Sequence, residues 1–257
     1  MYNQLQLREI FHIEFLRCLA ADMPTGVWAL KGGVNLRLFF KSIRYSEDMD
    51  IDVAELPVES VKKRVMRILK SPSFRENLKT YGITGIRPPD MAAAKQTAVT
   101  QRFKVHITTS AGEDYFTKVE FSRRGFQGEP AAEPVSPAVL RPYAMAPLVV
   151  PHYPAEAAAA QKISAVLSRS VPQARDIFDL YLLSAQVRPG EKRLTLPDKS
   201  ELVKVRENIL APGFELFRDV VAAYLTPADR KVYCAPGVWD EIKLKAADFV
   251  KELGDAA

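Results

Sequence analysis

The sequence predicts an α/β domain followed by an all-α domain, and three observations lead to this prediction. Apolar segments of strand character alternate with amphipathic helical segments over roughly the first 145 residues. Beyond residue 154 the periodic segments are helical. Between the two regions, residues 129–154 contain seven prolines, which forbid a continuous helix and are typical of a linker. We therefore expect one domain at residues 1–145 and a second at residues 146–257.

The elements of the first region follow from the spacing of their apolar residues. Three- and four-residue steps from Leu7 to Cys18 indicate an amphipathic helix, and short alternating or apolar runs bounded by turn residues indicate strands. In chain order the sequence predicts a helix at 5–21, a strand at 27–30, a helix at 34–40, a strand at 48–53, a helix at 61–70 and strands at 97–109 and 115–122. The outer face of the helix at 61–70 is basic, which is typical of a solvated surface or of an RNA contact.

The second region contains helical periodicity and helix-start signals. Asp198 and the Thr226-Pro227 pair are residues that favour the first positions of a helix. The predicted helices span 155–169, 174–186, 198–210, 213–225 and 238–253.

The composition is that of a globular protein in a reducing compartment. The chain of 257 residues is 47% hydrophobic and 26% charged, which excludes global disorder. No stretch approaches the roughly 20 apolar residues of a membrane span, and no signal-peptide pattern follows Met1, so we expect a cytoplasmic protein without a membrane partner. Cys18 and Cys234 are too few for a disulfide framework or a zinc site. The net charge of +5 is compatible with a nucleotide or RNA partner but does not identify one.

Two glycines and an acidic strand can carry phosphoryl chemistry. Gly32 and Gly33 lie between a predicted strand and a predicted helix, where backbone N–H groups and the helix dipole can bind phosphate. Strict alternation then places Asp48, Asp50 and Asp52 on one face of the next strand.

Carboxylates two residues apart on a strand converge on one side and can hold a pair of Mg²⁺ ions. Such a pair stabilises the attacking and leaving oxygens of an in-line phosphoryl displacement. Glu120, on the polar face of another predicted strand, is the candidate for a third metal ligand. His12, His106 and His152 are isolated, and we expect structural roles for them.

Four motifs of this sequence resemble those of a toxin family. They are LKGGVNLR at 30–37, RYSEDMDID at 44–52, KISAVLSR at 162–169 and RDIFDLY at 175–181. Together, and in this order, they resemble the AbiEii/AbiGii family of abortive-infection toxins, within the polymerase-beta-like nucleotidyltransferase superfamily. The part of the chain from residue 186 onward matches only as a generic helical tail.

The resemblance implies a polymerase-beta-like domain with a mixed sheet and a helical domain that completes the nucleotide cleft. It makes Gly32 and Gly33 the phosphate-binding turn. It also implies that Asp48 and Asp50 are catalytic metal ligands, because this pair fits the family's frame anchored on Arg44 and Ser46, which are themselves expected to contact the nucleotide. The pair Asp50/Asp52 would shift that frame by two residues, and strand geometry alone leaves both pairs open.

The later motifs imply two further catalytic residues. Lys162 is expected to bind the nucleoside triphosphate and neutralise its charge, and Asp176 to position or deprotonate the acceptor. Asp179 lies on the same helix face as Asp176 and is equally compatible with an ordinary helical ion pair to Arg175.

The expected activity is attack of an acceptor hydroxyl on the α-phosphorus of a nucleoside triphosphate (NTP), with Mg²⁺ as cofactor. The family implies a bacterial toxin of an abortive-infection, phage-defence system that a cognate antitoxin protein neutralises. It also implies an RNA acceptor, with the 3′ end of tRNA expected. Transfer to a protein hydroxyl stays open as an alternative. A non-catalytic nucleotide- or RNA-binding module is the other alternative, against which the intact acid pair argues.

Overall fold

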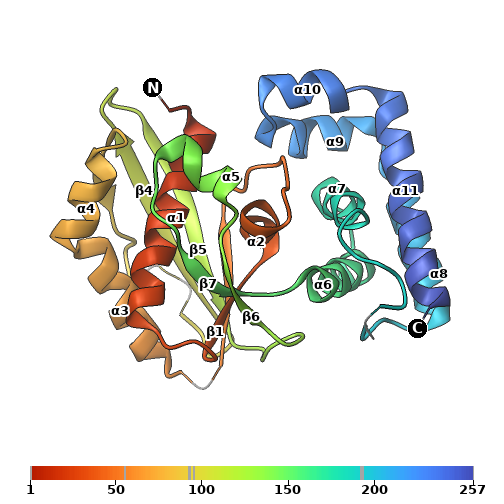
Figure 1. Ribbon diagram of the computed structural model, residues 1–257, viewed down its shortest axis with the longest axis horizontal. Coiled ribbons are helices and arrows are strands. Elements are labelled where there is room, and N and C mark those ends of the chain that lie inside the picture. Colours follow the sequence, from red (N-terminus) through yellow and green to blue (C-terminus); the bar gives the residue numbers. More distant parts are fainter. Residues whose placement is uncertain (1, 55, 92–93, 95, 192–193, 257) are drawn as a thin grey trace. The chain divides into compact units, whose positions relative to one another are not determined.

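The computed structural model describes residues 2–54, 56–91, 94, 96–191 and 194–256 (Figure 1). The chain divides into two compact units. The first contains Met1–Phe39 and Tyr45–Tyr153, and the second contains Phe40–Arg44 and Pro154–Ala257. The first residue of the RYSEDMDID motif, Arg44, therefore belongs to the second unit, whereas the rest of that motif belongs to the first.

The first unit is built on a seven-stranded mixed sheet in the order β3-β4-β5-β2-β1-β7-β6. The pairs β1·β7 and β2·β5 are parallel, and the other neighbouring pairs are antiparallel. The predicted α/β class with a mixed sheet is confirmed. The strands are β1 (Trp28–Lys31), β2 (Met49–Val53), β3 (Ile83–Arg87), β4 (Thr100–Thr109), β5 (Asp114–Ser122), β6 (Ala131–Pro134) and β7 (Val149–His152).

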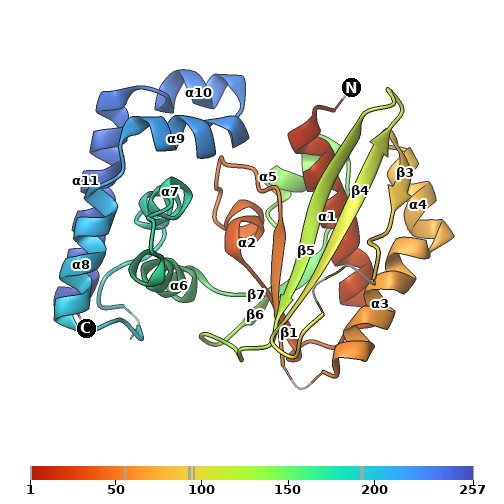
Figure 2. The same ribbon diagram turned by 180° about the vertical axis from the view of Figure 1, so that it is seen from behind.

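The helices of the first unit are unequally distributed over the sheet. Helices α1, α3 and α4 lie together on one face, and Figure 2 looks onto the opposite face of β4 and β5. A capping box between Asn3 and Gln6 begins α1, whose aliphatic and aromatic residues from Ile10 to Leu19 are fully buried. The helical segments are α1 (Gln4–Asp22), α2 (Gly32–Phe39), α3 (Val58–Lys70), α4 (Pro72–Lys79), α5 (Pro137–Leu140) and the 3₁₀ helix η1 (Arg141–Tyr143).

The proline-rich segment 129–154, expected to be a linker, instead forms β6, α5, η1 and β7. Three of its prolines occupy positions that tolerate them. Pro134 ends an edge strand, where a missing N–H breaks no ladder, and Pro137 and Pro142 lie at helix starts, where the N–H has no helical partner. The number of prolines therefore indicates interrupted secondary structure here, and the sheet extends to His152.

The second unit is all-α, as predicted. Rings of Phe178, Phe217 and Trp239 form its centre, with centroids 5.7 Å apart for the first pair and 4.8 Å for the second. The predicted helix at 213–225 ends at Val220, and a second helix begins after Thr226, whose hydroxyl caps it. The helical segments are α6 (Ala155–Ser168), α7 (Ala174–Leu183), α8 (Lys199–Leu210), α9 (Phe214–Val220), η2 (Ala222–Tyr224), α10 (Pro227–Tyr233) and α11 (Pro236–Asp255).

Among the described residues, no helix combines the length and the hydropathy that crossing a membrane requires.

Candidate active site

The glycine turn lies directly against an aspartate of the acidic strand. Gly32 begins α2 with φ +69°, a conformation that side chains disfavour. A Cβ placed on Gly32 would lie 2.6 Å from Oδ2 of Asp50, which is closer than real Cβ contacts allow. Lys31, the last residue of β1, is the cross-strand partner of Asp50. The glycine therefore allows the backbone at the start of α2 to approach the Asp50 carboxylate.

Asp48 lies immediately before the acidic strand β2 and is held by one lysine. Its Oδ1 accepts the backbone N–H of Lys118 at 3.1 Å, and its Oδ2 lies 2.7 Å from Nζ of the same residue. The hydroxyl of Ser46, predicted to contact the nucleotide, donates to the backbone carbonyl of Asp48 at 2.8 Å. Ser46 therefore shapes the turn that leads into Asp48.

Asp52 differs from the other two aspartates of the strand because it is buried and bonded. Its side chain is 1% exposed. Oδ1 pairs with Nζ of Lys31 at 2.6 Å, and Oδ2 accepts the hydroxyl of Tyr153 at 2.7 Å. Burial and the adjacent Asp52 carboxylate both raise the pKa of Tyr153, so its hydroxyl stays protonated and donates. Asp52 thus links the ends of β1 and β7 to β2.

Glu120 lies beside Asp50 on the sheet but is engaged by an arginine. The two residues are partners across the parallel strands β2 and β5. Arg102, opposite Glu120 on β4, forms an ion pair and a hydrogen bond with it. The hydrogen bond to Glu120 is the main cause that raises the pKa of Arg102, and the charges of Asp48 and Asp50 contribute. Within the described part of the chain, no group of three His, Cys, Asp or Glu side chains is arranged to hold a metal ion.

The residues of the later motifs form an ion network in the helical unit. Nζ of Lys162 lies 2.8 Å from Oδ1 of Asp176 and 2.6 Å from Oδ2 of Asp179. Arg44 binds Asp179 through Nη2 at 2.9 Å and Nε at 3.2 Å. Arg169 binds Oδ2 of Asp176 at 3.0 Å. The partners that order Asp179 are thus Arg44 and Lys162, which were predicted to contact the nucleotide.

Burial and charge determine the protonation of this network. Asp176 and Asp179 are 1% and 0% exposed. Burial opposes the charge of the Lys162 ammonium, but Asp176 and Asp179 outweigh it and raise its pKa. Burial likewise opposes the Asp176 carboxylate, and the Lys162 charge outweighs it and lowers the pKa of Asp176. Both groups are therefore charged at neutral pH.

Two histidines have structural contacts, as predicted. Burial is the main cause that lowers the pKa of His12 to about 3, so the ring is neutral. Its Nε2 lies 2.8 Å from the hydroxyl of Thr117, which donates to the carbonyl of Glu47 next to Asp48. Buried His152 contacts the amide oxygen of Asn35 at 2.9 Å. The amide nitrogen of Asn35 donates to the Tyr153 carbonyl, which ties α2 to the end of β7.

Sequence reasoning missed several of these partners. Lys31, Asn35 and Arg169 lie inside the recognised motifs, so the motifs themselves contained the signal. Lys118 and Tyr153 lie outside them, and only the strand register brings them to the aspartates.

The comparison with known families decides the classification. The model of the nucleotidyl transferase AbiEii toxin family, a type IV toxin–antitoxin system, matches residues 14–219. This match covers all four motifs and most of both units. The chain belongs to the AbiEii family. No curated protein sequence matches it.

Two solved structures resemble this AbiEii-family chain in fold. JHP933 from Helicobacter pylori aligns with a TM-score of 0.56 at 19% identity, covering 99% of this chain and 94% of that one. MenT4, a nucleotidyltransferase toxin from Mycobacterium tuberculosis, aligns with a TM-score of 0.60 at 18% identity, covering 95% of this chain and 83% of that one. As a member of the AbiEii family, the protein is a nucleotidyltransferase toxin of a type IV toxin–antitoxin system, a class that uses an NTP and has an antitoxin partner.

Proposed function

We propose that this AbiEii-family toxin transfers a nucleoside monophosphate from an NTP to a hydroxyl of an RNA acceptor, and that this acceptor is the 3′ end of tRNA. The acceptor hydroxyl gives its proton to solvent, its oxygen bonds to the α-phosphorus, the bond from the α-phosphorus to the oxygen that bridges to the β-phosphorus breaks, and pyrophosphate leaves. The observation that carries the proposal is that Gly32 leaves no room for a Cβ beside the Asp50 carboxylate. It brings a phosphate-binding turn and a metal-binding group into direct proximity.

The carboxylates of the strand fit Mg²⁺, and their contacts favour one pair. Mg²⁺ usually binds through one or two carboxylates together with substrate phosphates and water. Asp48 is partly exposed, whereas both oxygens of Asp52 are engaged by Lys31 and Tyr153 in the interior. We therefore assign Asp48 and Asp50 as the ligands. When bound, Mg²⁺ would neutralise phosphate charge and orient the reacting oxygens.

Other residues of the first unit bind the phosphates or position the carboxylates of the metal ligands. The N–H groups at Gly32 and Gly33 bind the phosphates of the NTP. Lys118 holds the Asp48 carboxylate on the open sheet face, and Ser46 fixes the turn before it. Glu120 stays a candidate third ligand, which would have to exchange Arg102 for the metal.

In the helical unit, Lys162 neutralises charge on the triphosphate and Asp176 orients the acceptor. Lys162, Arg44 and Arg169 surround two carboxylates, which leaves one net positive charge for a phosphate group. The lowered pKa of Asp176, which Lys162 causes against the effect of burial, makes this carboxylate a weak base. We therefore assign Asp176 a positioning role. Arg44, through Asp179, positions the same network.

A labelling experiment tests the proposal. The toxin is incubated with Mg²⁺, each of the four α-labelled NTPs in turn, and either total tRNA or lysate protein. We expect label on tRNA with one or a few of the NTPs, and none with the Asp50→Asn variant. Label in the protein fraction alone would overturn the RNA acceptor and indicate modification of a protein hydroxyl. No label in either fraction, with an NTP shown to bind, would contradict the transfer reaction itself.

A further inference from the structure

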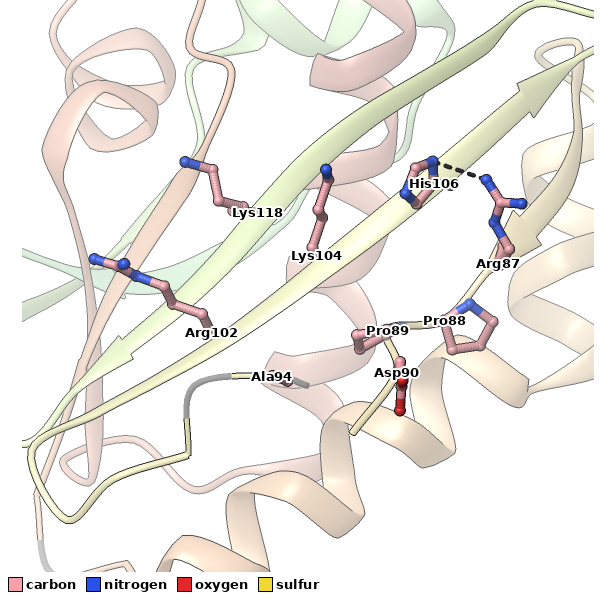
Figure 3. A pocket seen from close by; sticks show the side chains of 9 residues that line it. All are labelled: Arg87, Pro88, Pro89, Asp90, Ala94, Arg102, Lys104, His106 and Lys118. Atoms are coloured by element: carbon pink, nitrogen blue, oxygen red, sulfur yellow. Dashed lines mark hydrogen bonds between the residues drawn. The ribbon is translucent and has the colours of Figure 1, made fainter. Parts of the chain in front are cut away.

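A basic cavity lies on the sheet face that carries the aspartates. It has a volume of about 470 Å³. Five basic side chains line it, and Figure 3 shows them on the same side of three neighbouring strands: Arg87 from β3, Arg102, Lys104 and His106 from β4, and Lys118 from β5. One carboxylate, that of Asp90, also lines it. We call this space the β4 cavity.

The strand register connects the β4 cavity to the aspartates. Asp50 is the partner of Glu120, and Glu120 is the partner of Arg102, so these three residues form one row across β2, β5 and β4. Adjacent strands are about 4.8 Å apart, which places the basic residues of β4 about 10 Å from β2. Lys118, which pairs with Asp48, lines the cavity as well. The metal ligands and the cavity are therefore neighbours on one surface.

The charges of the cavity are arranged for an anion. Lys104 and Lys118 are direct cross-strand partners, and like charges in this arrangement destabilise a sheet. Among the described residues, Lys104 has no carboxylate partner, and its ammonium lies 4.3 Å from the centre of the Phe116 ring. Arg87 contacts His106 and the exposed Asp114, and such exposed ion pairs exchange for a ligand at little cost.

The order of the strands indicates whether the β4 cavity binds the phosphates of the NTP or those of the RNA acceptor. In an in-line displacement the attacking oxygen and the leaving oxygen lie on opposite sides of the phosphorus. Gly32, the assigned site of the NTP phosphates, follows β1 on one side of β2. The β4 cavity lies on the other side of β2, beyond β5. An acceptor that attacks opposite the leaving pyrophosphate therefore comes from the side of the cavity.

We propose that the β4 cavity binds the phosphodiester backbone of the RNA acceptor next to its reacting 3′ hydroxyl. The inference rests on the proposed function, since it assigns the acceptor's binding site in that reaction. Lys104 and Arg87 provide the charges that bind the backbone, and Phe116 lies beneath Lys104 on the same face.

Equilibrium binding of a single-stranded RNA tests this without any transfer reaction. The probe is a labelled RNA of about 12 nucleotides with a 3′ hydroxyl, within the usual site size of single-strand binders. The Lys104→Ala/Arg87→Ala variant is compared with Lys63→Ala/Lys70→Ala, which removes two exposed basic residues of α3 on the opposite face of the sheet. Thermal unfolding of both variants checks that the fold is kept.

The counterion-release relation gives the expected size of the effect. Each neutralised phosphate contributes a slope of about −0.7 to log K against log salt for a single strand. Removal of two such charges should reduce the slope by about 1.4 and weaken binding about 25-fold at 0.1 M salt. The α3 variant should bind the RNA as tightly as the unchanged protein, and both variants should keep their affinity for the NTP.

Three outcomes would overturn the inference. Unchanged RNA affinity and salt slope in the Lys104→Ala/Arg87→Ala variant would remove the acceptor from the cavity. Loss of RNA affinity in the α3 variant alone would move the RNA to the opposite face. Loss of NTP affinity with unchanged RNA affinity would assign the cavity to the triphosphate. The labelling experiment above fails or succeeds independently, because binding of the RNA probe requires no catalysis.

Discussion

The two aspartate clusters of this toxin use the same side chain in opposite surroundings. Immediately before β2, Asp48 is 29% exposed and pairs with Lys118, which is 41% exposed. In the helical unit, Asp176 and Asp179 are almost completely buried and share Lys162. An exposed ion pair contributes about 0–1 kcal/mol and can open for a metal, whereas breaking a buried pair costs several kcal/mol. Burial therefore separates a carboxylate whose ion pair can open for a metal from carboxylates whose ion pairs also stabilise the fold.

The largest effect is expected for Asp50 on β2. Asp50→Asn should reduce nucleotidyl transfer at least about 10³-fold, since loss of a metal ligand removes several kcal/mol of transition-state stabilisation. The free energy of unfolding of the Asp50→Asn protein should differ from that of the unchanged protein by less than about 0.5 kcal/mol, because the substitution leaves the packing of the core unchanged. The measurements are label incorporation and urea unfolding. Asp48→Asn should behave in the same way.

Asp52→Asn is the matched variant on the same strand. It removes the buried charge that Lys31 and Tyr153 share, so it should lower the free energy of unfolding by about 1–3 kcal/mol and keep more activity than Asp50→Asn. An inactive, fully stable Asp52→Asn protein beside an active Asp48→Asn protein would show that Asp50 and Asp52 are the metal pair.

The second effect concerns the stability of the helical unit. Asp179→Ala leaves Arg44 and Lys162 without a shared carboxylate in the interior. We expect a loss of about 3 kcal/mol in the free energy of unfolding, near the lower end of the range for broken buried pairs, because Lys162 keeps Asp176. Asp240→Ala, which removes an exposed partner of Lys243, is the control and should cost under about 1 kcal/mol. Equal, small losses in both variants would contradict a structural role of the network.

The sequence predicted those elements of the fold that have a regular local spacing of apolar residues. The strict alternation at 48–53 gave the acidic strand β2, and the apolar run before Gly32 gave β1, because both patterns are local. The strand β7 was missed, since its four residues lie among prolines and reach the sheet only through pairing with β1 and β6. The local proline content favoured a linker, but pairing of β7 with β1 and β6 makes this segment part of the sheet.

The candidate site also has features that local sequence patterns predict and features that depend on long-range contacts. The motifs contain Gly32 and Asp50, which the pairing of β1 with β2 brings together in space. They do not reveal that Asp52 is bonded by Tyr153, 101 residues later, or that Arg44 folds with the helical unit. Such contacts depend on tertiary packing, which a pattern of residue types does not specify.

The third effect separates function from stability at Lys162. Lys162→Met should lower kcat/KM for the NTP about 10²-fold, because the variant cannot neutralise triphosphate charge in a water-excluded site. It should also destabilise the protein, because Asp176 and Asp179 lose a partner. In Lys162→Met/Asp176→Asn, removal of both charges should restore part of the stability while activity stays low. Activity that recovers together with stability would make Lys162 purely structural.

The smallest effect is a difference in acid sensitivity between the two units. The histidines of the sequence, His12, His106 and His152, are all in the first unit. The folded pKa of His12 is lowered to about 3 from 6.5, mainly by burial, so between these pH values the unfolded chain binds a proton that the folded chain does not. Stability therefore falls as the pH falls through 6.5, by about 1.4 kcal/mol at pH 5.5 from His12 alone. In the helical unit, Asp176 has a pKa lowered from 3.8 by Lys162 in spite of burial, so its contribution is lost only below that pH.

One buried tryptophan in each unit makes this difference measurable. Trp28 reports on the first unit in a Trp239→Phe variant, and Trp239 reports on the second in a Trp28→Phe variant. Between pH 8 and pH 5.5, urea unfolding followed by fluorescence should shift to lower urea for Trp28 and stay nearly constant for Trp239. Replacing His12 by Gln should remove about 1.4 kcal/mol of the pH dependence, because a neutral amide can still donate to Thr117. If the two tryptophans report one common transition, the units unfold together and the His12→Gln comparison alone measures the effect. An unchanged pH dependence in His12→Gln would show that His12 is not the buried neutral group that makes the sheet unit sensitive to acid.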